Sequence, residues 1–399
     1  MHEIAKNIYW NGIKHWTLRN FHGRELSTHR ASTYNAYIVR DEKTALIDTV
    51  WDPFADEFAA SLEAGVGAKN IDLIVINHNE PDHGGSLGRV MELVPEGTPI
   101  YCSKNGAESI RKYFHRDDWN INVVKTGDSV SLGGRELTFV EMRLIHWPDS
   151  MMTFDSGAGV LFSNDAFGQH YCASGFFNDE VDECELYQEA IKYFANILAP
   201  YAPLIEKKLD EITALGLPVK LIAPSHGVIW RRDPLQIVGK YAEWAKAYSE
   251  GFAVIAYDCL YNATPAMAAA IAQGLANRGA AYKIFNTGGT DMSDLMTDMF
   301  CARGIIVGSS TVNNTVHRSI AGLLDDIRGH RLRGKIGAAF GSYGWSGEAP
   351  RLISEHLKGS GIEVAEEPLR AQYAPTPDDL RKCVEFGERF AEAMAAKRA

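Results

Sequence analysis

Short apolar runs alternate with longer amphipathic segments along most of the chain, which is the pattern of an α/β protein. The clearest run is Ile-Asp-Leu-Ile-Val-Ile at residues 71–76, whose β-branched residues predict a buried strand. In the first 250 residues we expect further strands at 34–39, 44–49, 100–102, 121–124, 136–140, 160–163 and 219–223. We expect helices at 53–63, 87–93, 105–114 and, interrupted near Pro200 and Pro203, at about 185–215.

The pattern begins anew near residue 250. A buried-type strand at 252–257 leads into an Ala-rich helix at 265–278, and Pro265 suits its first turn, where the N–H that proline lacks is not needed. Further strand–helix units begin at 281–285, 304–308 and 335–340, and a last helix is expected near 376–396. This alternation predicts a doubly wound parallel sheet. The sequence therefore predicts two domains, residues 1–249 and 250–399.

Composition excludes several classes of function. At 399 residues the chain is too long for one ordinary core. A formal net charge of -11 and the lack of a basic run argue against nucleic-acid binding. No apolar run approaches the ~20 residues that span a bilayer, and the N-terminus lacks the apolar core of a signal peptide. The six cysteines form no Cys-x-x-Cys pair, which argues against a zinc ribbon or a rubredoxin-type site. Their scatter suits reduced thiols. With the lack of a membrane-spanning run, this leads us to expect a cytoplasmic protein with no membrane partner.

A dense group of metal-ligand residues follows the strand at 71–76. Residues 77–86 read Asn-His-Asn-Glu-Pro-Asp-His-Gly-Gly-Ser, and other predicted strands end near further histidines and an aspartate. The seven candidate metal ligands are His78, Glu80, Asp82, His83, His146, Asp165 and His226. They are enough for two cations, and Asp165, which arrives from a separate strand, is the candidate bridge. Imidazole with carboxylate suits iron, manganese or zinc. The candidate ligands recur at the ends of predicted strands, which argues for a layered α/β sandwich with its site along one edge.

Three loops of the second half follow predicted strands and indicate a second ligand. The turn at 258–264 opens a helix, whose N-terminal N–H groups can receive a phosphate. It is not Gly-x-Gly-x-x-Gly and lacks a P-loop lysine, which argues against a dinucleotide or a nucleoside triphosphate. Glycines at 308–314 and 341–347 permit close backbone approach, and the pattern resembles flavodoxin-type FMN binding. The candidate FMN-binding residues are Asp258, Cys259, Tyr261, Asn262, Ala263, Thr264, Ser309, Ser310, Thr311, Asn313, Asn314, Ser342, Tyr343, Gly344, Trp345, Ser346 and Gly347.

The motif His-x-Glu-x-Asp-His, with later His, Asp and His, resembles the metallo-β-lactamase fold. The hydrolases of that superfamily usually have His where Glu80 stands. Together with Arg143-x-x-His-Trp-Pro-Asp-Ser-Met and Ser163-Asn-Asp-x-Phe-Gly, this glutamate makes nearly the whole chain similar to the flavodiiron proteins. The resemblance implies an N-terminal metallo-β-lactamase-like αββα sandwich and a C-terminal flavodoxin-like sheet. It also implies two irons, one held by His78, Glu80 and His146, the other by Asp82, His83 and His226, with Asp165 as the bridge.

The resemblance further implies an oxidoreductase. Electrons from rubredoxin or a similar separate donor would pass through FMN to the diiron site, which would reduce dioxygen to water, nitric oxide to nitrous oxide, or both. It implies a head-to-tail homodimer. Three further residues, His22, His170 and Tyr193, are candidates to hydrogen-bond a diatomic ligand or, alternatively, satisfy core contacts. A binuclear zinc hydrolase with a docking flavodoxin-like module is the alternative, and the sequence does not rank oxygen against nitric oxide.

Overall fold

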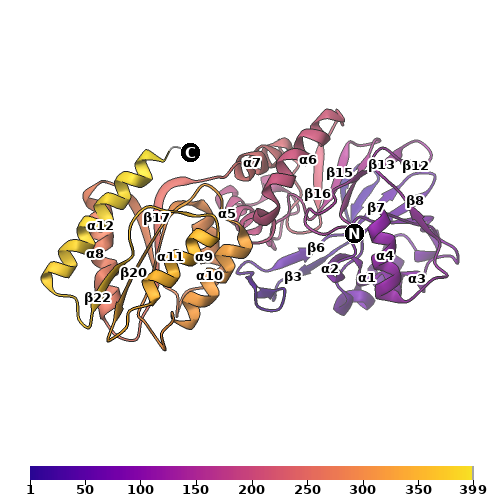
Figure 1. Cartoon of the computed structure of the whole chain (residues 1–399). Coiled ribbons are helices and arrows are strands. Elements are labelled where there is room, and N and C mark those ends of the chain that lie inside the picture. Colours follow the sequence, from indigo (N-terminus) through magenta and orange to yellow (C-terminus); the bar gives the residue numbers. More distant parts are fainter. Residues whose placement is uncertain (398–399) are drawn as a thin grey trace. The chain divides into compact units, whose positions relative to one another are not determined.

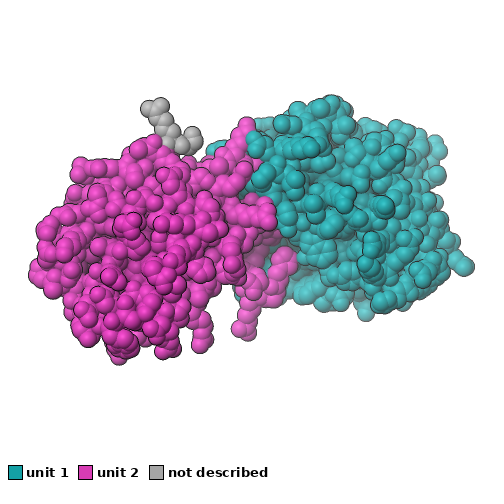
Figure 2. Space-filling view, in the orientation of Figure 1, with its two compact units in different colours: residues 1–21, 28–194, 201–243 teal, residues 22–27, 195–200, 244–399 magenta. Residues whose placement is uncertain are grey.

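The computed structural model describes residues 1–397 and divides them into two compact units (Figure 2). Unit 1 comprises residues 1–21, 28–194 and 201–243, and unit 2 comprises residues 22–27, 195–200 and the described residues from 244 onward. We propose that the boundary between the two domains, 1–249 and 250–399, lies at residue 249. Among the described residues, no helix is both long and apolar enough to cross a membrane.

Unit 1 contains two larger sheets. The seven-stranded sheet has the order β1 (His2–Ala5), β2 (Ile8–Trp10), β7 (Tyr37–Arg40), β8 (Thr44–Ile47), β9 (Leu73–Ile76), β10 (Ile100–Cys102) and β11 (Ile121–Val123). The five-stranded sheet has the order β12 (Ser129–Ser131), β13 (Glu136–Glu141), β14 (Met151–Asp155), β15 (Val160–Asn164) and β16 (Leu221–Pro224). A small two-stranded sheet of the same unit pairs β3 (Ile13–His15) with β6 (Ser32–Tyr34).

The alternation of side chains along each strand builds the layers of unit 1. On β8, Ala45 and Ile47 join a core shared with the second sheet, where Phe139 and Phe162 lie. Leu46, between them, joins a different core that includes residues of the helices. Those helices are α1 (Ala55–Gly65), α3 (Leu87–Met91) and α4 (Lys104–Phe114). A layer of helices therefore covers the first sheet, which packs on the second sheet. Three more helices come later in the chain: α5 (Glu183–Tyr193), α6 (Ala202–Ala214) and α7 (Leu235–Ala245).

Two expected elements are divided in the structure. The strand expected at 34–39 is two strands, β6 and β7, because the backbone N–H of Asn35 between them donates to Ser225 O instead of to a neighbouring strand. The long helix expected at about 185–215 is interrupted as predicted, by a π-helical turn at Phe194–Leu198 and a short 3₁₀ turn that ends at Tyr201. Proline at 200 and 203 cannot donate the hydrogen bonds of a continuous helix.

Unit 2 is built on a parallel sheet with the order β18 (Ala281–Asn286), β17 (Glu250–Asp258), β19 (Ala302–Ser309), β20 (Ile336–Tyr343) and β21 (Glu363–Val364), and β22 (Leu369–Gln372) also pairs with β20. Figure 1 shows α8 (Ala263–Asn277) and α12 (Pro377–Ala396) on one side of the sheet. It shows α9 (Met292–Cys301), α10 (Arg318–His330) and α11 (Ala349–Gly359) on the other. This is the doubly wound fold that the sequence predicts, and its loops after β17, β19 and β20 share one edge.

Candidate metal and flavin sites

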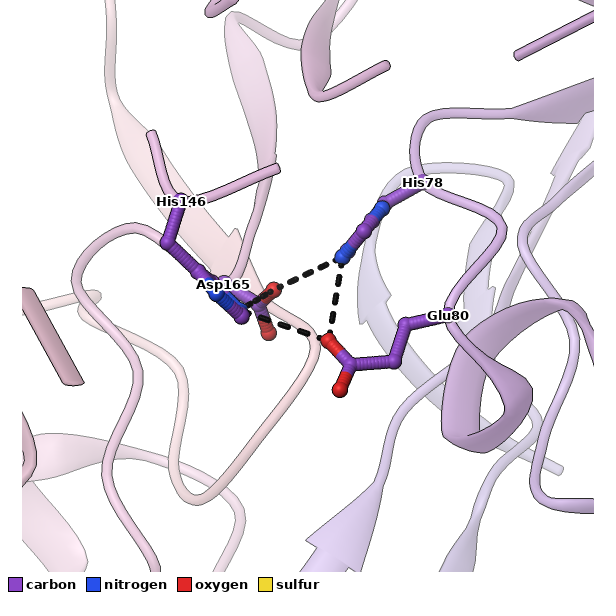
Figure 3. Close-up of side chains that lie close together, drawn as sticks. All are labelled: His78, Glu80, His146 and Asp165. Carbon is purple, nitrogen blue, oxygen red and sulfur yellow. Dashed lines mark hydrogen bonds and ion pairs between the residues drawn. The ribbon is translucent and has the colours of Figure 1, made fainter. Parts of the chain in front are cut away.

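Four of the predicted ligands converge at the ends of different strands of unit 1 (Figure 3). Nε2 of His78 lies 3.2 Å from Oε2 of Glu80 and 3.6 Å from Oδ2 of Asp165. Nε2 of His146 lies 3.3 Å from the same glutamate oxygen and 3.2 Å from the same aspartate oxygen. The four donor atoms therefore surround one point, which we call position 1.

The other three predicted ligands form a second group beside the first. Oδ2 of Asp82 lies 3.4 Å from Nε2 of His83 and 3.1 Å from Nε2 of His226. Oδ1 of Asp165 lies 3.0 Å from Nε2 of His83 and 3.6 Å from Nε2 of His226. These atoms surround position 2, and the two oxygens of Asp165 face different positions. All seven residues that the sequence singled out thus come together, in the two groups that the resemblance implies.

The loop after β9 is fixed by the polar groups around it. Asp48 accepts hydrogen bonds from both the backbone N (2.7 Å) and the side-chain Nδ2 (2.9 Å) of Asn77, the residue before His78. Thr49 Oγ1 donates to the carbonyl oxygen of His83. The backbone N of Met151, the first residue of β14, donates to Asn77 O at 2.9 Å, which ties the edges of the two sheets together. Ligands from both sheets are therefore held at one edge.

Two ligand histidines are oriented by a hydrogen bond from the ring nitrogen that points away from the cluster. Nδ1 of His78 lies 3.1 Å from both carboxylate oxygens of Asp149, which also accepts from the backbone N of Asn79 at 2.8 Å. Nδ1 of His226 donates to the carbonyl oxygen of Thr33 at 2.7 Å. Such a bond places the proton on Nδ1 and leaves the Nε2 lone pair for a metal.

The donor set fits two metal ions. Ligand atoms about 2.1 Å from a metal and about 90–110° apart are separated by about 3.0–3.4 Å, close to the distances here. Oδ2 of Asp82, Nε2 of His83 and Oδ2 of Asp165, which face the two positions, are buried and make no hydrogen bond of regular geometry. Orphaned buried polar atoms are costly, and a pair of cations would satisfy them. No cysteine contributes, so hard or borderline cations are favoured.

The electrostatics of the cluster agree with a site for cations. Burial lowers the pKa of the His146 ring, but Asp165 and Glu80 outweigh it and raise that pKa to about 9. Burial likewise opposes the charge of the Asp165 carboxylate, yet His83 and His146 hold its pKa well below the usual value. These carboxylates stabilise the positive charge of protonated histidine rings in a buried place. They will also stabilise metal ions there, because metal ions carry positive charge too.

Two of the three candidate catalytic residues lie beside position 2. The ring of His170 is 4.9 Å from that of His226, and Nδ1 of His170 is 2.8 Å from Ser32 Oγ. The Tyr193 ring is 5.1 Å from His170, and burial raises the pKa of its phenol well above the usual value. The phenol therefore keeps its proton and is a hydrogen-bond donor. His22 instead belongs to unit 2, where it lines a cavity of about 140 Å³ with residues of α9 and α10.

The three predicted flavin loops come together at one edge of the sheet in unit 2. The backbone N of Leu260 donates to Ser310 Oγ at 3.2 Å, and the backbone N of Thr311 donates to Ser342 O at 2.9 Å. The hydroxyls of Thr264 and Ser342 are 2.8 Å apart. Each loop is thus bonded to a neighbour, and residues 258–264, 309–314 and 342–347 surround the start of the fifteen-residue helix α8.

The rings at this edge are exposed. Tyr261 is 83% exposed and Trp345 is 86% exposed. These two exposed rings could pack against a flat ring bound between the loops.

Asp149 and His317 were missed at the level of sequence, and Ser225 makes a contact that was not expected of a serine in that place. Asp149 and Ser225 hydrogen-bond to ligands at positions 1 and 2. His317 places Nε2 2.9 Å from Ser310 Oγ in the flavin loops. Asp149 stands in a motif that carries the family resemblance and Ser225 directly precedes His226, but their roles depend on contacts across 71 and 60 residues of chain, which periodicity does not reveal.

Comparisons with known proteins agree with both units. Residues 32–227 match the model of the ODP family beta lactamases, and residues 255–387 match that of the flavodoxins. The anaerobic nitric oxide reductase flavorubredoxin of Escherichia coli K12 is 47% identical over 395 residues, which are 98% of this chain and 82% of that protein. The rubredoxin oxygen:oxidoreductase of Desulfovibrio gigas matches with a TM-score of 0.96 and 36% identity over 99% of each chain. The flavodiiron protein of Giardia intestinalis matches with a TM-score of 0.93 and 29% identity, over 99% of this chain and 97% of that one.

Proposed function

Because the chain belongs to the flavodiiron protein family, we propose that it is an oxidoreductase that reduces dioxygen to water, nitric oxide to nitrous oxide, or both. Its electrons come from rubredoxin or a similar donor and pass through FMN to a diiron centre. The observation that carries this proposal is the buried pair of ligand groups joined by Asp165, with Glu80 as an anionic ligand at position 1. The zinc hydrolase that the sequence left open is not favoured, because relatives over nearly the full length are named as reductases.

The seven ligands are proposed to hold one iron at each position. When bound, the irons and FMN supply the one-electron steps of the reduction. Tyr193 and His170 lie beside His226 and would donate hydrogen bonds to a small ligand at position 2. Since the Tyr193 phenol stays protonated, it offers a proton in that place over the whole physiological pH range. The cluster is largely buried, which keeps bulk water away from the two positions.

The loops of unit 2 are proposed to hold FMN. The start of α8 would receive the phosphate, because the first N–H groups of a helix have no partner within it. Thr264 stands in the first turn of that helix, and its buried hydroxyl would contact the phosphate. Trp345 and Tyr343 would cover the isoalloxazine ring. The other candidates in the three loops would supply backbone N–H groups and side-chain bonds.

We further propose that the protein is a cytoplasmic head-to-tail homodimer. The exposed rings of Tyr261 and Trp345 support a second surface over the flavin loops. Light scattering of the purified holoprotein should give twice the chain mass of 44.1 kDa. A monomer in solution that keeps full turnover would contradict the dimer.

Two measurements test the proposed activity. Protein purified with its native metal should contain iron and show the visible absorbance of FMN, whereas zinc without flavin would favour a hydrolase. The protein is then reduced by rubredoxin without oxygen and mixed separately with dioxygen and with nitric oxide. Turnover with at least one gas is expected, and its absence with both would refute the proposal.

Glu80→Ala provides a matched variant for the same assay. It removes an oxygen 3.2 Å and 3.3 Å from His78 and His146, so iron content and turnover should fall while FMN remains bound. Asp56→Asn is the control, because its side chain is 90% exposed and its ion pair with Arg89 lies at the surface of the protein. It should keep its iron, its flavin and its turnover.

A further inference from the structure

Ser225 stands between β16 and the ligand His226, and hydrogen bonds hold its backbone on both sides. Its backbone N donates to Asn164 O at 2.8 Å, and its backbone O accepts from Asn35 N at 2.7 Å. The residue is fully buried, and its Oγ lies 3.1 Å from Oδ1 of Asp165. An ionised carboxylate accepts hydrogen bonds but donates none, so the hydroxyl proton of Ser225 points at the bridging aspartate.

This hydrogen bond reaches only one of the two oxygens of Asp165. Oδ1 faces His83 and His226 of position 2, at 3.0 Å and 3.6 Å. Oδ2 faces His146 of position 1 at 3.2 Å, and Ser225 makes no hydrogen bond to it in the described residues. The hydroxyl proton of Ser225 therefore partly neutralises the oxygen that serves position 2 and acts less on the oxygen that serves position 1.

The groups that accept a hydrogen bond from the ligand histidines also make position 1 more electron-rich than position 2. At position 1, the His78 ring donates to the Asp149 carboxylate, which carries a full negative charge. At position 2, the His226 ring donates to the carbonyl oxygen of Thr33, which is neutral. A carboxylate behind a histidine makes the ring a stronger electron donor than a carbonyl does. Position 1 is thus the more electron-rich of the two.

We propose that Ser225 is a positioning residue that makes the two metal positions unequal, so that the first electron to reach the diiron centre stays at position 2. The inference rests on the proposed diiron function. A less negative oxygen ligand stabilises the ferrous ion over the ferric ion, because the ferric ion gains more from negative charge. The step is one electron from the flavin to one ferric ion, with no bond made or broken in the protein.

The test compares Ser225→Ala, Ser225→Gly and Ser225→Thr with the wild type. Each holoprotein is titrated anaerobically with a reductant while the signal of the half-reduced iron pair is followed by electron paramagnetic resonance. Loss of the hydroxyl in the Ala and Gly variants should lower the equilibrium constant of the first iron reduction about tenfold, a shift of about 59 mV to more negative potential. The Thr variant keeps a hydroxyl and should keep the wild-type potential. The flavin potentials, measured in the same titration, should not change.

Ser163→Ala is the matched control. Ser163 is also buried and also lies close before a ligand in the chain, but its hydroxyl donates to the backbone carbonyl of Ala166 and not to a carboxylate. It should leave the iron potential unchanged. If the Ala and Gly variants match the wild type, or if the Ser163 variant shifts the potential equally, the inference is wrong. If the wild type binds no iron or reduces neither gas, the proposed function itself fails, which is a different result.

Discussion

Asp149 offers the sharpest test of how position 1 is built. Asp149 accepts from Nδ1 of His78, at 3.1 Å to each oxygen, and from the backbone N of Asn79 at 2.8 Å. Asp149→Asn keeps the shape but leaves only one acceptor oxygen, so either the ring or the backbone N–H faces an amide NH₂. The change also removes the charge that strengthens His78 as a ligand. Loss of such a support weakens metal binding about 10–100-fold, which corresponds to ~1.4–2.7 kcal/mol.

The assay is a competition titration. Metal-free protein is titrated with ferrous iron in the absence of oxygen and in the presence of a chelator, and two binding constants are fitted. One of the two constants should weaken in Asp149→Asn, while the other, for position 2, should change by less than a factor of about three. The exposed Asp56→Asn variant controls for loss of net charge. Equal constants in Asp149→Asn and the wild type would show that His78 does not need its partner, and would refute the reasoning.

Three further predictions concern other parts of the chain. Tyr193→Phe should keep its iron but lower turnover about tenfold, the value of one hydrogen bond, as measured by gas consumption with each substrate. Thr264→Val should weaken FMN binding to the flavin-free protein about tenfold in a fluorescence titration, with iron content unchanged. Lys335 is buried and its Nζ donates to the carbonyl oxygens of Tyr248 and Phe300; Lys335→Met should abolish the rise of stability between pH about 7 and about 10, as measured by urea unfolding. Burial lowers the pKa of Lys335 from 10.5 to about 7, so the unfolded chain binds the extra proton between those values and wild-type stability rises with pH there, by up to ~1.4 kcal/mol per pH unit.

The sequence predicted the fold class and the family correctly because both depend on local patterns. Buried strands such as β9 and β19 are runs of β-branched residues, and the parallel order of unit 2 follows from their alternation with helices. The meeting of the candidate ligands could be predicted because strands that run in the same direction end at one edge, where the polar residues that follow them lie close together. The break at Asn35 was not predictable, since it depends on a hydrogen bond to Ser225, 190 residues later.

The supporting groups around the ligands could not be predicted for the same reason. Asp149 and Ser225 stand beside residues with strong motif signals, yet a serine or an aspartate in a loop is usually explained by turn formation. Only the packed structure shows that one lies behind His78 and the other against Asp165. The choice of position 2 for the first electron therefore follows from contacts across the two sheets and not from the ligands themselves.

Glu80 shows how a small change in one loop adapts this scaffold to redox chemistry. It is the N-cap of the short helix α2 (Pro81–Gly84), a place where a side chain usually bonds to the N–H groups of the first turn. Glu80 makes no such bond, and Pro81 at the first helical position removes one N–H that would need it. The carboxylate instead lies against His78 and His146. With Asp82 and Asp165 it gives the ligands a formal charge of about three negative units, where a histidine at this place would give about two, and more negative ligands favour the ferric state. One carboxylate in place of a histidine therefore favours reversible oxidation of the bound metal over Lewis-acid chemistry.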